Sequence, residues 1–147
     1  MPVATITEGR DLILAHFKTA WDAGPPPVPL VLYDDTEGDL PPDDHYVRVT
    51  IQHNVFEQRT LGGKPSLGGG GRRFRRSGLL TVQIFTINDD GLTRSDALVD
   101  LLMDAFEGED TSSDEVEFIN ARANEVGHDG AWHQTNVLVE FRYDRIK

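Results

Sequence analysis

The stretch that decides the fold runs from His45 to Ile87 and reads HYVRVTIQHNVFEQRTLGGKPSLGGGGRRFRRSGLLTVQIFTI. Apolar residues at 47, 49 and 51 alternate with polar residues at 48, 50 and 52, which is typical of a half-buried strand. Strand-forming residues are dense again from Leu79 to Ile87. Between them, Leu61–Gly71 holds six glycines and reads as a flexible loop. We therefore predict a long antiparallel hairpin, with strands over His45–Thr60 and Arg72–Ile87 and a tip that projects from the body.

Two amphipathic helices are predicted outside this hairpin. The first spans Thr7–Asp22, with Thr7 as the expected N-cap and apolar residues at 13, 17, 20 and 21 on one face. Gly24 and the three prolines at 25–27 end it. The second spans Leu92–Phe106, where leucines, Ala105 and Phe106 form an apolar stripe and aspartates at 96, 100 and 104 lie on another face.

The remaining segments complete the fold class. Leu30–Tyr33 reads as a short edge strand, and Asp34–Asp44 as an acidic surface loop. Val116–Val126 and Ala131–Tyr143 read as two strands around a turn at His128–Gly130. The order predicts an α+β domain over residues 1–147: an antiparallel sheet of four to five strands, two helices packed on one face, and a long projecting β-hairpin loop.

The charge is distributed unevenly along the chain. Its 147 residues carry a net charge of −11, which argues against general nucleic-acid binding. Five basic residues nevertheless lie between Leu61 and Leu80 without an acidic one: Lys64, Arg72, Arg73, Arg75 and Arg76. A positive loop on a negative body predicts an interface with another subunit or partner through these five residues, the alternative being that the arginines are simply solvated.

In a strand, Arg73 and Arg75 would point opposite to Arg72, Phe74 and Arg76, which divides any nucleic-acid patch between two faces.

Composition and spacing favour a protein without a chemical site. There is no cysteine, hence no disulfide, zinc-thiolate site or thiol nucleophile. Pro65 interrupts the Lys64–Ser66 pair that a phosphate-binding loop would need, and a strand is expected after it rather than a helix. Among the five histidines, His128 and His133 could form a metal site together with Asp129. We expect no metal and no cofactor. No apolar run is long enough to span a membrane and the N-terminus lacks a signal pattern, so we expect synthesis in the cytoplasm without membrane contact.

Two motifs then carry a resemblance. Gly78–Phe85, GLLTVQIF, and Asp129–Val137, DGAWHQTNV, together with the order of elements from Ile6 to Tyr143, resemble a family of small phage proteins akin to the tail terminators of long-tailed phages. The acidic loop Asp34–Asp44 and the triple proline are not typical of that family.

The resemblance implies a non-enzymatic virion protein, assembled in the bacterial host cytoplasm. It would form a homo-oligomeric ring, typically hexameric, on the head-proximal end of the tail tube. Its partners would be the tail tube protein and the head-completion or connector protein. In such a ring the arginines could contact a neighbour or face a lumen through which DNA passes without sequence-specific contacts. The alternatives are a neck or head–tail connector component and, from a different class, a phosphate- or nucleotide-binding enzyme that uses the glycine loop.

Overall fold

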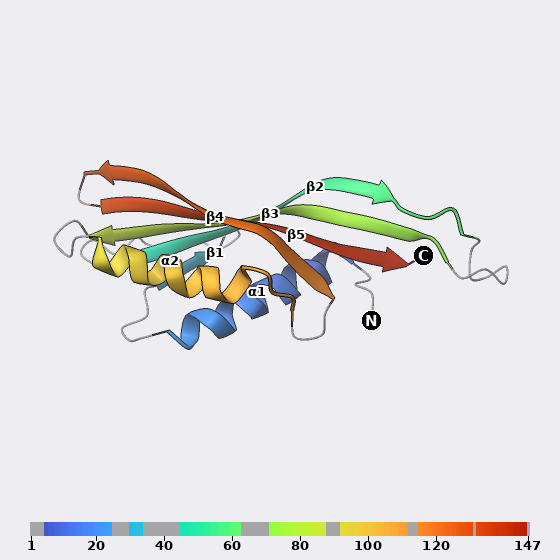
Figure 1. Ribbon diagram of the computed structural model, residues 1–147, viewed down its shortest axis with the longest axis horizontal. Coiled ribbons are helices and arrows are strands. Elements are labelled where there is room, and N and C mark those ends of the chain that lie inside the picture. The colour runs from blue at the N-terminus through green and yellow to red at the C-terminus, as the bar shows by residue number, and fades with distance from the viewer. Residues whose placement is uncertain are drawn as a thin grey trace.

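The structure is a computed structural model that describes residues 5–24, 30–33, 45–62, 71–87, 92–111, 115–130 and 132–146. The elements, in chain order, are α1 (Ile6–Asp22), β1 (Leu30–Tyr33), β2 (Tyr46–Gln58), β3 (Arg73–Ile87), α2 (Thr93–Phe106), β4 (Val116–Asp129) and β5 (Trp132–Ile146). Figure 1 shows one elongated sheet with both helices on the same side of it.

The strands form a five-stranded sheet in the order β1-β2-β3-β5-β4. β2, β3, β5 and β4 pair antiparallel, so the predicted α+β class and antiparallel sheet are confirmed. One difference is at the edge, where β1 pairs parallel to β2, with Leu30 opposite Tyr46 and Tyr33 opposite Val49. A parallel pair needs a long return connection, and the chain between Tyr33 and Tyr46 is long enough to supply it.

The core lies between the sheet and the helices. Ile13, Phe17 and Trp21 from α1 are buried, as are Leu98, Leu102 and Phe106 from α2. The sheet contributes one face of every long strand, including Val49, Leu80, Val82, Val139 and Phe141. Alternate positions along β3 and β5 are buried and partly exposed, which is the period-two pattern of a sheet covered on one side.

Helix α1 begins earlier than the sequence predicted. Its cap is Thr5 rather than Thr7: the Thr5 hydroxyl accepts a hydrogen bond of 3.1 Å from the backbone N–H of Glu8. Thr5 and Thr7 are equally good N-cap candidates by residue type. Because the helix begins at Ile6, Thr5 occupies the N-cap position. α2 begins at Thr93 without a side-chain cap, and β4 and β5 run beyond Val126 and Tyr143 because they continue to pair.

The sheet extends beyond the helical layer at one end (Figure 1). We call this extension the arm and define it as residues 55–62, 71–77 and 142–146. Its β2–β3 ladder is described as far as Gln58 opposite Phe74, after which the backbone N–H of Arg59 donates to the Arg73 carbonyl at 2.7 Å. Residues 63–70, where the projecting loop is predicted, lie outside the described residues, so the loop itself stays a prediction.

Candidate functional site: the arginine-bearing arm

A β-bulge and a glycine together shape the root of the arm. The β2–β3 register shifts between His53 and Val55, opposite Gly78. A Cβ atom on Gly78 would overlap the Gln52 carbonyl oxygen and would lie 2.8 Å from Cζ of Phe141. Gly78 therefore lets strand and ring pack closely at the bend. After the bulge Phe56 stands opposite Arg76, and Glu57 stands opposite Arg75. The bulge thus sets which side chains each face of the arm displays.

Arg73 and Arg75 share one carboxylate on the face that points away from the helices. Nε of Arg75 lies 3.0 Å from Oδ1 of Asp144, and its Nη2 lies 3.4 Å from Oδ2. Nε of Arg73 is 3.7 Å from the same carboxylate. The hydrogen bond to Asp144 raises the pKa of Arg75. Asp144 therefore neutralises part of the positive charge on this face.

Arg76 has a different environment on the opposite face of the arm. Its guanidinium carbon lies 4.7 Å from the centre of the Phe56 ring, within the range of a cation–π contact. Among the described residues, no carboxylate oxygen lies within 4.0 Å of Arg76. The Phe56 side chain is 56% exposed, and Leu61 farther out is 92% exposed. Arginine and aromatic residues dominate the binding energy of many protein interfaces, and here an exposed ring lies beside a partly exposed arginine.

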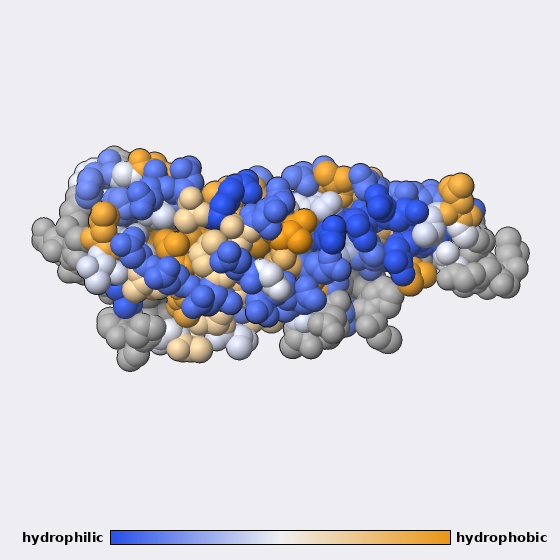
Figure 2. Space-filling view, in the orientation of Figure 1, coloured by the Kyte–Doolittle hydropathy of each residue, from blue (hydrophilic) through white to orange (hydrophobic). Residues whose placement is uncertain are grey.

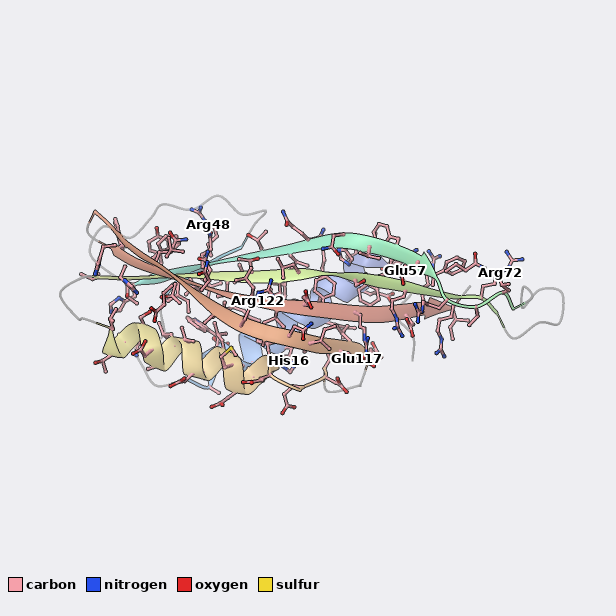
Figure 3. All side chains as sticks on the ribbon, turned by 45° about the horizontal axis from the view of Figure 1, so that its top comes forward. His16, Arg48, Glu57, Arg72, Glu117 and Arg122 are labelled. Carbon is pink, nitrogen blue, oxygen red and sulfur yellow. The ribbon has the colours of Figure 1, made fainter. Side chains whose placement is uncertain are left out.

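The outermost described part of the arm is held by local hydrogen bonds. Nε of Arg72 donates to the carbonyl of Gly62 at 3.0 Å, and the backbone N–H of Arg73 donates to the Thr60 hydroxyl at 2.9 Å. Figure 3 shows Arg72 farther from the helices than Glu57. The arm is thus three-stranded as far as Gln58, Arg73 and Ile146, and these hydrogen bonds hold the described residues beyond the strands.

His53 links the root of the arm to β5, and Arg10 of α1 links to the nearby Ile51. Nε2 of His53 lies 2.7 Å from the Tyr143 hydroxyl, while Nη1 of Arg10 in α1 donates to the Ile51 carbonyl at 2.7 Å. Burial, together with the positive charges of Arg10 and Arg76, lowers the pKa of His53. Burial raises the pKa of Tyr143, so this hydroxyl stays protonated. His53 is a residue that sequence reasoning missed, although it continues the alternation of 47, 49 and 51.

The rest of the exposed sheet face carries paired charges. Arg142 contacts Glu117 at 2.6 Å, and Arg122 lies 4.0 Å from Glu140. In Figure 2 strongly hydrophilic residues gather over the half of the molecule that bears the arm.

The helical layer is acidic by contrast. Along α1 and α2, Glu8, Asp11, Asp22, Asp96, Asp100 and Asp104 outnumber Arg10, Lys18 and Arg94. Basic arm and acidic layer are therefore separate parts of one chain.

The five residues predicted to form an interface divide as follows. Arg73 and Arg75 share a face, and Arg76 lies on the other face with Phe56, so the predicted split is confirmed for these three arginines. Arg72 precedes β3 and donates to the Gly62 carbonyl. Lys64 lies outside the described residues. The role of these residues in an interface stays a prediction.

The other candidate sites gain no support from the arrangement. The rings of His128 and His133 lie 5.0 Å apart, but the side chain of Asp129 is outside the described part of the chain. Where the structure describes side chains, no group of three or more histidines and carboxylates is placed to hold a metal ion. The glycine loop leads into β3, not into a helix whose N-terminus could bind phosphate. Neither described helix is long and apolar enough to cross a membrane.

Comparison with known proteins supports the fold only. No family model and no curated protein matches the sequence. One of the solved structures with a similar fold has a TM-score of 0.63 and 18% sequence identity, over 91% of this chain and 94% of that one. Its name indicates no function. At this identity the likeness establishes a shared architecture over nearly the whole length of both chains, without any transfer of activity or partners.

Proposed function

We propose that this protein is a structural virion protein of a long-tailed phage. It binds the head-proximal end of the tail tube as a ring, ends tube polymerisation, and presents the surface to which the head-completion protein joins. The observation that carries the proposal is the arm. It extends beyond the helices with an exposed aromatic ring and an arginine that has no described carboxylate partner, while the helical layer of the same chain is acidic.

Two different, complementary surfaces on one chain favour a head-to-tail contact. Such a contact between copies uses one surface of each subunit against a different surface of the next, and it forms a ring when the rotation closes. The number of subunits, six, comes from the resemblance to tail terminators. The pairing of Arg73 and Arg75 with Asp144 leaves Arg76 as an arm arginine without a described carboxylate partner, which a neighbour could supply. The proposed role needs contacts between proteins and no catalysis.

The test compares two matched double variants. Phe56→Ser with Arg76→Ser removes an exposed aromatic ring and an arginine from the arm. Arg122→Ser with Val126→Ser removes an arginine and an apolar side chain, 54% exposed at Val126, from β4. Assembly is followed by native mass measurement and by electron microscopy with purified tail tubes.

We expect wild-type protein and the β4 variant to cap one end of the tubes, and the arm variant to lose capping at the same protein concentration and salt. Equal capping by the arm variant contradicts the role of the arm. Wild-type protein that ignores tubes but binds isolated heads contradicts the terminator function and indicates a connector instead.

A further inference from the structure

A groove on the helical side has no assigned role. It lies between α1 and the C-terminal end of α2 and has a volume of about 600 Å³. Alanines at 15, 20, 23 and 105 line it beside Leu12, His16 and Thr19, and the short alanine side chains leave space between the two helices. The groove is therefore a concave surface into which side chains of another protein segment can enter.

The groove is held open by the packing beneath it. Nε2 of His16 lies 2.7 Å from the Ala105 carbonyl oxygen, which ties α1 to α2. The His16 ring also packs against Phe106 and Phe118, with ring centres 5.1 and 4.9 Å away. A partner would meet a formed surface and would not have to pay the cost of ordering it.

The rim of the groove is acidic. Asp104 and Glu109 line it, and in the part of the chain that the structure describes no lysine or arginine does so. Neither carboxylate has a described basic group within 4.0 Å. Asp100, Glu107 and Asp110 add negative charge nearby along the sequence. An occupant with an apolar side chain for the floor and an arginine for the rim would match this surface.

We propose that the groove receives the arm of a second copy of this chain. Phe56 and Leu61 enter the alanine-lined floor, and Arg76 pairs with Asp104 and Glu109 at the rim. The arm offers the matching set: exposed apolar side chains beside an arginine that lacks a described carboxylate partner. Bidentate pairing with a carboxylate suits the planar guanidinium.

The same chain does not supply both halves of this contact. In Figure 3, His16 in the groove and Arg72 on the arm lie well apart along the molecule, and the arm points away from the helices. An arm that fills a groove must then belong to a neighbour. This inference rests on the proposed ring, and it names the surface through which each copy would hold the next.

A charge-reversal experiment tests the pairing. Arg76→Glu should weaken self-association at least about tenfold, and Asp104→Arg with Glu109→Arg should do the same, because each leaves like charges in contact. Combining all three changes should restore association to within about threefold of wild type, since opposite charges then meet again. Arg48→Glu is the control and should associate as wild type does, because Arg48 is exposed elsewhere on the sheet and has no described carboxylate within 4.0 Å. Association is measured by sedimentation velocity over a range of protein concentrations.

Contact is measured independently by crosslinking. Because the chain has no cysteine, Leu61→Cys combined with Ala20→Cys introduces the only thiols. Mild oxidation should give covalent oligomers between copies, whereas Leu61→Cys combined with Asn124→Cys should give none. If the variant with all three reversed charges does not recover association, the groove is not the docking site. The same holds if Leu61→Cys crosslinks equally with Ala20→Cys and with Asn124→Cys.

Failure of this inference is distinguishable from failure of the proposed function. If wild-type protein caps tubes but the triple charge-reversal variant does not recover association, the terminator role stands and the groove is not the docking site. Wild-type protein that fails to cap tubes removes the terminator role, and the sedimentation and crosslinking results still decide whether copies of the chain dock arm to groove. Wild-type protein that neither caps nor associates overturns both.

Discussion

Alanine in place of Gly78 is expected to destabilise the protein at the root of the arm. The added Cβ would overlap the Gln52 carbonyl oxygen and lie 2.8 Å from the Phe141 ring. Backbone is less free to move than a side-chain end, and Phe141 is fully buried at 0% exposed. Overpacking of this kind costs about 1–3 kcal/mol, and we expect the upper end of that range here.

The expected loss translates into a measurable shift in the thermal midpoint. For a chain of this size each kcal/mol corresponds to roughly 2–4 °C, so Gly78→Ala should melt roughly 6–12 °C below wild type. Urea unfolding followed by circular dichroism gives the free energy directly. Because the β2–β3 pairing must shift to admit the methyl group, the arm should also change direction and assembly should weaken.

A control separates crowding from the general loss of a glycine. Gly108 has a φ of +70° and nothing within 4 Å of a Cβ placed on it, so Gly108→Ala tests backbone strain alone. We expect this control to cost about 1 kcal/mol. If the stability of Gly78→Ala is within about 0.5 kcal/mol of wild type, Gly78 is not closely packed against Gln52 and Phe141.

Four further predictions concern single residues. The pKa of His53 is lower in the folded protein than in the unfolded chain, so the unfolded state binds the proton first as the pH falls. The free energy of unfolding should therefore decrease as the pH drops below about 6.5 toward the lowered pKa. His53→Gln should reduce this decrease, measured as urea midpoints between pH 8 and 5. Asp144→Asn should cost about 1 kcal/mol at low salt and less in 1 M salt, because two arginines lose their shared carboxylate, and an equal cost at both salts would contradict the ion-pair account. Phe106→Ala should cost about 3–5 kcal/mol by leaving a cavity under α2, and a cost below about 1 kcal/mol would place Phe106 outside the core. Thr5→Ala should cost about 1 kcal/mol by removing the cap of α1, whereas Thr7→Ala should have almost no effect.

Period-two and helical patterns predicted the fold class because each element buries only one face. The alternation at 47, 49 and 51 and along the last strand marked the sides that face the helices, and the stripes of both helices marked the faces that cover them. The parallel edge strand was not predictable, because the four residues of β1 carry no signal for direction. Direction depends on pairing partners that only the folded chain brings together.

The arm was predictable only in outline. Sequence placed five basic residues around a glycine loop, and strand alternation separated Arg73 and Arg75 from Arg76. It gave no sign that Asp144, far away in the chain, would pair with two of these arginines. The Phe56–Arg76 contact was equally hidden, because it depends on a bulge that reverses the facing of β2 after His53. A bulge adds one residue to one strand, and the single sequence contains no reference against which that extra residue stands out.

The terminator role is tested most directly by mixing purified protein with tail tubes and counting capped ends by electron microscopy. The account predicts a ring of density at one end of each tube, tubes that stop growing, and loss of both effects on Phe56→Ser with Arg76→Ser but not on Arg122→Ser with Val126→Ser. Tubes that keep growing, with no density at their ends at any protein concentration, would contradict it.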